Sequence, residues 1–246
     1  PDELRKHIRY PEDLFVIQSR LYSTYHMTDP TVFYNKEDLW EIPEENYSGN
    51  SIKMKPYYII GQLPGEEKAE FILMRPFTPV GKNNMVSWMA ARSDGDHYGE
   101  LMTYTFSKES LVFGPMQIES RIDQDSDISQ LLSLWSQRGS RVIRGNLLII
   151  PIDDSILYVE PIYLQAESSE LPEMKRIVVS YGNELEMATT LDQALAQIFG
   201  VEQAEDVPAD IQDILPSEFG SQYEELLEEL EEILQQLREL KGNENF

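Results

Sequence analysis

The chain has 246 residues, of which 41% are hydrophobic, and this length and composition suffice for one large domain that buries its own core. Its 44 Asp and Glu residues outnumber its 20 Lys and Arg residues, and the resulting formal net charge of −24 argues against nucleic acid as a partner. The chain has no cysteine, which excludes thiolate catalysis, disulfide bonds and cysteine-ligated zinc but leaves the cellular compartment open.

A helix over residues 11–26 is the first predicted element. Pro11 followed by Glu12 and Asp13 is typical of a first helical turn. The apolar residues of this helix recur at helical spacing and form one stripe, which consists of Leu14, Ile17, Leu21 and Tyr25. His26 falls where the helix ends, and an imidazole at that position favours a capping role over metal binding.

The next segments predict a short helix, a loop and a pair of strands. Asp29 can cap the short helix, in which Pro30 takes the first position. Residues 41–51 have the character of a loop. Residues 57–60 and 71–74 are runs of strand-forming residues, and they predict an antiparallel pair.

Two further strands are predicted after a segment with helical spacing. Residues 84–91 place three apolar residues as on one face of a helix, namely Met85, Trp88 and Met89. Residues 101–106 and 111–118 are the two strand candidates.

The following part of the chain predicts a helix and two hairpins. Asp127 can cap the helix, whose apolar face runs to Trp135. The hairpins consist of residues 147–152 with 156–164 and of residues 177–181 with 185–187.

The folded body is predicted to end near Gly200, which stands where a left-handed helix terminator is expected. Thr190 and Gln193 match the capping box of the helix before it. Residues 201–216 predict an acidic linker, and residues 217–246 predict an acidic amphipathic helix. The apolar stripe of that helix is suited to self-association or to a protein partner, through Leu226, Leu230, Ile233 and Leu237.

Together these elements predict the α+β class, in which antiparallel hairpins form one or two sheets with short helices at their sides and an amphipathic helix follows at the C-terminus. Residues 1–200 are expected to form the domain. Residues 202–246 hold 14 acidic and 2 basic residues, so −12 of the net charge falls in the linker and the terminal helix.

The loop around residues 94–99 is the most polar local constellation. Asp94, Asp96 and His97 combine carboxylates with an imidazole, and such groups can hold a metal ion or act as a general base. A glycine-rich acidic loop between two elements also needs no function, and the sequence contains no strained nucleophile motif. Both interpretations stay open.

Arg138, Arg141 and Arg144 form the one basic cluster and are candidates for binding a phosphate or carboxylate ligand. On a strand, the second and third of these arginines would point to opposite faces, and in so acidic a chain internal pairing with Asp or Glu is favoured. Residues 123–127 space three carboxylates like the start of a calcium loop, but the rest of that loop is absent, so capping by Asp127 is preferred. No motif identifies a cofactor.

Several stretches resemble the large bacterial membrane proteins of Uncharacterised Protein Family 0182. The stretches are RYPEDLF at residues 9–15, TDP with FY at residues 28–34, PFTP at residues 76–79, GPMQ at residues 114–117, GSRVIRGNL at residues 139–147 and YVEPIYLQAE at residues 158–167. The resemblance covers the chain from residue 9 to about residue 200, and the last three stretches are long enough to be specific.

This resemblance implies a multi-pass N-terminal membrane region, followed by a large domain outside the cytoplasm of which the chain would be the C-terminal portion. A first residue other than Met fits a fragment or a processed product. The family brings no reaction and no catalytic residues with it. We therefore expect a binding or structural module of the cell envelope, held at the cell membrane, and the alternative is an envelope hydrolase or metal-dependent enzyme with its site near residues 94–97.

Overall fold

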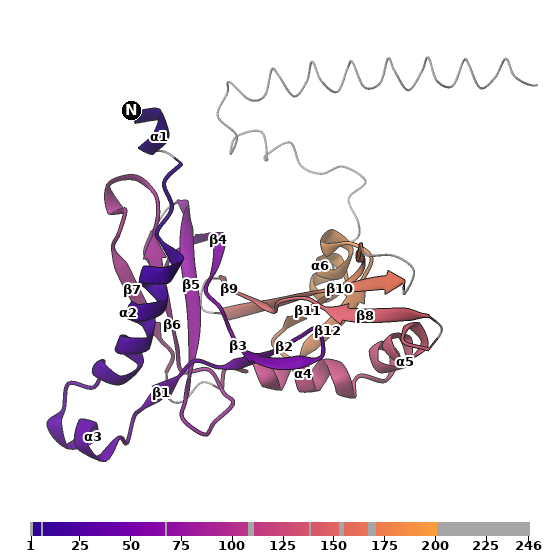
Figure 1. The fold of residues 1–246 in the computed structure, drawn as a ribbon, viewed down its shortest axis with the longest axis horizontal. Helices are drawn as coiled ribbons and strands as arrows, with labels where there is room; N and C mark the ends of the chain where they lie inside the picture. Colours follow the sequence, from indigo (N-terminus) through magenta and orange to yellow (C-terminus); the bar gives the residue numbers. More distant parts are fainter. Residues whose placement is uncertain are drawn as a thin grey trace, which may run out of the picture. The chain divides into compact units, whose positions relative to one another are not determined.

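A computed structural model of the chain describes residues 2–5, 7–66, 68–107, 111–137, 139–152, 155–166 and 171–200 (Figure 1). These residues belong to one compact unit, Pro1–Val201. The predicted linker at residues 201–216 and the predicted amphipathic helix at residues 217–246 lie outside the described residues, so both stay predictions.

The first sheet has five antiparallel strands with β5 at its centre. Its strands are β1 (Trp40–Glu41), β4 (Tyr57–Gln62), β5 (Ala69–Pro79), β6 (Ser87–Arg92) and β7 (Leu101–Thr105). One edge of β5 pairs with β4 and then with β1, whereas the other edge pairs with β6, which in turn pairs with β7. Tyr57 lies opposite Met74, so the predicted antiparallel pair is confirmed, and β7 confirms the predicted strand at residues 101–106.

Two predictions for this half of the domain are wrong. Residues 84–91 do not form a helix but lead into β6, where all six residues are buried, so no alternation of apolar and polar residues marks the strand. Residues 41–51 are not a loop, because most of them form β1 and a hairpin of β2 (Glu44–Tyr47) and β3 (Asn50–Lys53). That hairpin turns at Ser48 and Gly49, whose φ angles of 52° and 79° suit a tight two-residue turn.

The second sheet has five antiparallel strands around β10. Its strands are β8 (Ser140–Arg144), β9 (Leu148–Ile152), β10 (Ser155–Ala166), β11 (Glu173–Tyr181) and β12 (Glu184–Ala188). One edge of β10 pairs with β11, which pairs with β12, while β9 and β8 share the other edge. Both predicted hairpins are confirmed, β9 with β10 and β11 with β12, and Gly182 turns the second with a φ of 57°.

Short helices accompany the sheets. They are α1 (Asp2–Arg5), α2 (Glu12–Tyr25), α3 (Pro30–Asn35), α4 (Pro115–Gln124), α5 (Ser126–Trp135) and α6 (Leu191–Phe199), with a 3₁₀ turn η1 (Gly95–His97). The predicted caps of α3 and α6 are confirmed, because the side chains of Asp29 and Thr190 accept hydrogen bonds from backbone N–H groups of the first turn. His26 follows α2, and its Nδ1 lies 3.0 Å from the carbonyl oxygen of Tyr22, as the capping role predicts.

Two predictions in the middle of the chain are wrong. Residues 111–118 do not form a strand, because Gly114 and Pro115 are a helix-start pair with which α4 begins. The cap of α5 is Asp125 rather than Asp127, since Asp125 Oδ1 accepts hydrogen bonds from two backbone N–H groups of the first turn at 3.1 and 3.0 Å. Asp125 also ends α4, so the two helices are separated by a single residue.

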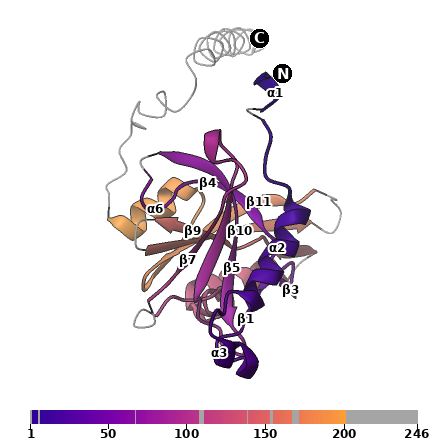
Figure 2. The ribbon, with the colours of Figure 1, turned by 90° about the vertical axis from the view of Figure 1, so that its left-hand side faces the viewer.

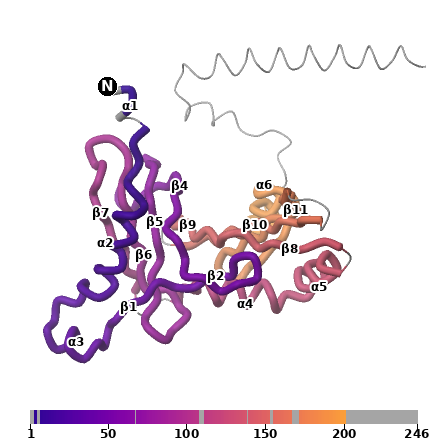
Figure 3. Tube along the Cα trace, viewed as in Figure 1, coloured from indigo at the N-terminus to yellow at the C-terminus, as the bar shows by residue number. Residues whose placement is uncertain are grey.

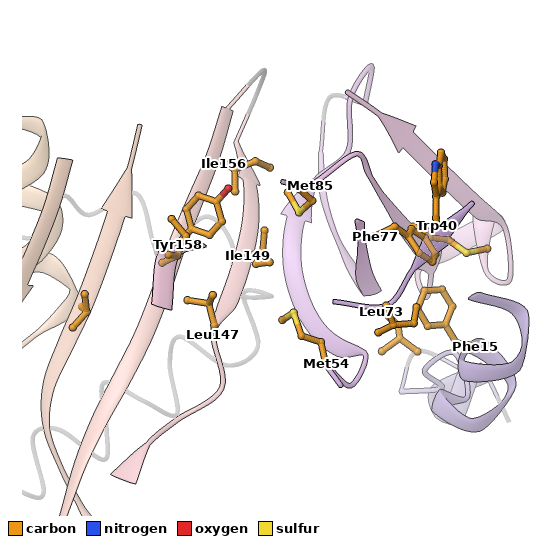
Figure 4. Packing of buried hydrophobic residues seen from close by; sticks show 14 of the residues in the cluster. Phe15, Trp40, Met54, Leu73, Phe77, Met85, Leu147, Ile149, Ile156 and Tyr158 are labelled. Atoms are coloured by element: carbon orange, nitrogen blue, oxygen red, sulfur yellow. The ribbon is translucent and has the colours of Figure 1, made fainter. Parts of the chain in front are cut away.

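The largest hydrophobic core joins both sheets and α2. Figure 4 shows Phe77 of the first sheet, Phe15 of α2, and Tyr158 and Ile149 of the second sheet, all of which belong to this buried cluster. Strands β4 and β9 lie side by side (Figure 3), where the Tyr57 hydroxyl donates to the Ile149 carbonyl at 2.9 Å and accepts from its N–H at 3.2 Å. The Tyr57 hydroxyl of the first sheet thus provides hydrogen-bond partners for both backbone polar groups of Ile149 in the second sheet.

The described residues confirm the predicted α+β class with antiparallel sheets and short flanking helices. Helix α2 lies beside β1 and β5, and α6 packs against β11 and β12 (Figures 1 and 2). Within the part of the chain that the structure describes, no helix combines the length and the apolar run needed to span a membrane.

Candidate functional site

The buried guanidinium of Arg144 in β8 gathers three carboxylates from β10 and α4. Arg144 Nε lies 2.5 Å from Glu160 Oε1 and its Nη2 lies 2.8 Å from Glu160 Oε2, so Glu160 is a bidentate partner. Arg144 Nη1 lies 2.6 Å from Asp123 Oδ1, and Nη2 also contacts the carboxyl group of Glu119. All three nitrogens of the guanidinium are therefore engaged by acids of the same domain.

The periodicities of strand and helix bring these side chains together. In the register of β8 with β10, Arg144 lies opposite Ile162, and Glu160 is two residues away on the same face of β10. Glu119 and Asp123 are four residues apart in α4 and so lie on one face of that helix. The cluster needs both elements to be formed.

The cluster holds more negative than positive charge in a nearly dry environment. The side chain of Glu160 is 0% exposed and that of Glu119 is 2% exposed, whereas Asp123 keeps 60% exposure. Burial, reinforced by the negative charge of Glu160, raises the pKa of Glu119 to about 8. Burial also raises the pKa of Glu160. We therefore expect Glu119 to carry a proton at neutral pH.

Another buried carboxylate, that of Glu45 in β2, binds the link between β8 and β9. Its Oε2 accepts a hydrogen bond from Leu147 N at 3.1 Å, and its Oε1 accepts one from Asn146 Nδ2 at 3.0 Å. Gly145 in the same link has no space for a side chain, because a Cβ there would lie 2.7 Å from Pro161 Cγ. Glu45 thus holds the link by hydrogen bonds, and Gly145 allows the chain to pass close to Pro161.

Of the three predicted basic residues, the two that the structure describes, Arg141 and Arg144, point to different sides of β8. Arg141 is exposed, and its Nη2 donates a hydrogen bond to Ser48 Oγ at 2.6 Å, whereas Arg144 faces the interior. The structure thus agrees with the expectation of opposite faces and, for Arg144, with internal pairing. Arg138 lies outside the described residues, and a ligand held by the first two arginines stays a prediction.

The loop that carries Asp94, Asp96 and His97 lies on the surface around η1. Asp94 Oδ2 accepts a hydrogen bond from the backbone N–H of Phe71 at 2.6 Å, so this carboxylate fastens the loop to β5. His97 Nδ1 lies 3.0 Å from Glu100 Oε2, and these two side chains are 52% and 55% exposed. Asp96 is exposed. Two of the three predicted metal ligands therefore already have partners close to the loop.

An open cavity of about 460 Å³ adjoins this loop. The ionisable residues among its lining are Glu66, Lys68, Glu70, Arg92, Asp94 and His97. Arg92 forms ion pairs with two of the carboxylates, because its Nη1 lies 2.8 Å from Glu66 Oε1 and its Nη2 lies 2.6 Å from Glu70 Oε1. Among the described residues, no group of three or more His, Asp or Glu side chains is placed to hold a metal ion. The cavity offers paired charges and one imidazole beside an acid.

Sequence reasoning missed the acids of the buried cluster and the placement of the α2 stripe. Glu119 and Glu160 belong to no local motif, and the one signal for Glu160 was an acid set inside a run of apolar strand residues. The predicted stripe of α2 is exposed, while its buried face carries Phe15, Ser19 and Ser23. The stripe is thus available to a partner.

Comparisons with known proteins converge on one family. The model of the Uncharacterised protein family (UPF0182) matches residues 1–135. A UPF0182 protein of Desulforamulus reducens is 58% identical over 200 residues, which are 81% of this chain and 22% of that protein. A UPF0182 protein of Methanospirillum hungatei is 58% identical over 205 residues, which are 83% of this chain and 23% of that protein. The chain spans about a fifth of the length of these curated relatives, and no solved structure matches it.

Proposed function

Because the chain belongs to the uncharacterised protein family UPF0182 and spans about a fifth of its relatives' length, we propose that it is a binding or structural module of a larger cell-envelope protein. In this proposal the module lies outside the cytoplasm and is joined to the cell membrane through a region beyond the matched residues, as the family resemblance implies. It presents a surface to other parts of the protein and does not turn over a substrate.

The observation that carries the proposal is the commitment of buried charges to the fold. Arg144 holds three carboxylates, and Arg92 pairs with Glu66 and Glu70. Removing one partner from a buried pair such as Arg144–Glu160 or Arg92–Glu70 costs about 3–5 kcal/mol, so these side chains are held in the fold and are not free to act on a substrate. In this domain, buried acidic and basic side chains of the kind that an enzyme would use for catalysis stabilise the fold instead.

The rival function is an envelope hydrolase or a metal-dependent enzyme with its site at the loop of residues 94–97. One observation favours it, because His97 Nδ1 lies 3.0 Å from Glu100 Oε2 beside a charged cavity, and a carboxylate can orient an imidazole as a general base. Both side chains are about half exposed, so water competes with their pairing.

Replacement of His97 distinguishes the two functions. We expect turnover no higher than background for the wild-type chain and for its His97→Ala and His7→Ala variants. The assays use chromogenic phosphate, ester, glycoside and peptide substrates, with and without Zn²⁺ or Mg²⁺. His7 is exposed and outside the loop, so its replacement controls for the loss of an imidazole. Turnover that falls tenfold or more in His97→Ala alone would establish the enzyme and reject the module.

The location outside the cytoplasm is tested by labelling intact cells. The chain contains no cysteine, and Leu134 on α5 is 62% exposed, so a cysteine at the equivalent position suits a full-length relative freed of its native cysteines. We expect a membrane-impermeant maleimide to label it in intact cells, while a cytoplasmic protein with an exposed cysteine stays unlabelled. Labelling that requires lysis would place the module in the cytoplasm.

A further inference from the structure

Helix α2 turns its apolar residues outward. Leu14, Ile17, Leu21 and Tyr25 are 45%, 58%, 53% and 66% exposed, although they form one continuous stripe along the helix. Large apolar side chains gain about 1.5–3 kcal/mol each when they are fully buried. An amphipathic helix at the surface of a complete domain normally directs that stripe to the core.

The face that does pack on the sheet is narrow and partly polar. It consists of Phe15, Ser19 and Ser23, of which the first two are 0% exposed. The buried guanidinium of Arg75 in β5 donates a hydrogen bond from Nη1 to Ser19 Oγ at 3.2 Å, and this contact fixes which face points inward. The small serine side chains let the helix approach the strands closely. Helix α2 therefore packs on the sheet through this face, and its apolar stripe points to the solvent.

The exposed stripe continues onto α3. The rings of Tyr25 and Phe33 stack with their centroids 5.8 Å apart, and the neighbouring Tyr34 is 86% exposed. Figure 2 shows α2 and α3 next to each other at one side of the first sheet. We call the surface formed by these residues the α2–α3 face, and it consists of Leu14, Ile17, Leu21, Tyr25, Phe33 and Tyr34.

The near absence of charge along the α2 stripe indicates an apolar protein surface as the partner of the α2–α3 face. Between Leu14 and Tyr25 the only charged residue is Arg20, and a single basic residue is far from the Lys/Arg-rich face with which a helix attracts nucleic acid or anionic lipid. Contiguous apolar patches on a domain mark contacts with protein or membrane surfaces, and the scarcity of basic residues on this helix favours a protein surface. The partner that fits the α2–α3 face therefore has an apolar surface of its own.

We propose that the α2–α3 face docks against an apolar segment of the same polypeptide, within the part of the full-length protein that lies outside the stretch matched by this chain. This proposal rests on the module function proposed above. The face lies within residues 1–135, which the family model matches, and the relatives carry close to four fifths of their length outside the matched stretch. A tethered segment also has a high effective concentration, which favours it over a separate chain.

Site-specific photo-cross-linking in a full-length relative tests the docking. A benzophenone amino acid is placed at the position equivalent to Ile17, and the matched control carries it at the position equivalent to Leu134, which is 62% exposed on α5. We expect the first position to cross-link, at least tenfold more than the control, to a peptide of the same polypeptide outside the matched stretch. A cross-link to a second copy or to another protein, or yields equal to the control, would overturn the proposal.

A second measurement separates docking from folding. The double substitution Ile17→Gln and Leu21→Gln should leave the melting temperature of the 246-residue chain within about 2 °C, because the replaced side chains are exposed. In the full-length protein the same substitutions should increase the rate of limited proteolysis several-fold. Equal proteolysis would reject the docking and leave the module function standing, whereas turnover that depends on His97 would reject the module function by itself.

Discussion

Replacing Arg144 with Met is expected to lower the free energy of unfolding by about 3–5 kcal/mol at pH 7. The substitution keeps much of the side-chain volume but leaves Glu160, which is 0% exposed, without a counter-charge and takes a partner from Glu119. Because Glu119 is already expected to be protonated at this pH, Glu160 would then have to take up a proton to stay buried. Urea unfolding followed by circular dichroism measures the loss, and the loss should shrink toward pH 4.5, where protonation of the acids becomes easier.

The matched control for this prediction is Arg141→Met, three residues earlier in the same strand. Arg141 is exposed and donates one hydrogen bond to Ser48, so its replacement should cost less than about 1 kcal/mol. If the two methionine variants lose similar stability, Arg144 is not the centre of a buried charge cluster. A double variant with Glu160→Met should recover part of the loss, because apolar groups can replace a buried ion pair.

The elements predicted correctly are those whose signals lie within a few residues. Asp29 before Pro30 and Thr190 before Gln193 act within a single helical turn, and the structure shows both caps. Gly200 after α6 adopts a φ of 64°, a conformation that glycine reaches at little cost. Local chemistry determines such positions whatever the rest of the chain does.

The errors arose where tertiary burial or an overlooked helix start decided the structure. Strand β6 is covered on both faces, so its apolar residues could not be distinguished by period from those of a helix. Gly114 before Pro115 was a usable signal for α4, but the apolar residues around it favoured a strand. Because α4 was missed, Glu119 and Asp123 could not be placed four residues apart on one helical face.

The candidate site and the α2–α3 face show two limits of periodicity. Internal pairing was predicted for the arginines, yet the partners of Arg144 depend on the register between β8 and β10, which no local pattern specifies. For α2 the spacing identified the stripe correctly but could not say which way it would face. The inward face is set by contacts such as that of Arg75 with Ser19, which are 56 positions apart in the sequence.

The Glu119→Gln variant is expected to be more stable than the wild-type chain at high pH and similar to it at low pH. Glutamine resembles a protonated carboxyl group in size and polarity, so it reproduces the state that burial favours in the folded protein. In the wild type the pKa of Glu119 rises from 4.5 in its ordinary environment to about 8 in the fold. The unfolded chain therefore releases this proton at a lower pH than the folded chain does, and wild-type stability falls as the pH rises between these values.

The gain from Glu119→Gln should therefore appear above pH 4.5, grow through neutral pH and level off above pH 8, where both states of the wild type are ionised. The shift sets an upper limit of about 5 kcal/mol on this gain. Urea unfolding of both chains at intervals from pH 4 to pH 9 gives the difference directly. Asp123→Asn is the control on the same helix, because Asp123 keeps 60% exposure. Parallel curves for Glu119→Gln and the wild type would mean that Glu119 is ionised in the folded protein and that Arg144 neutralises it.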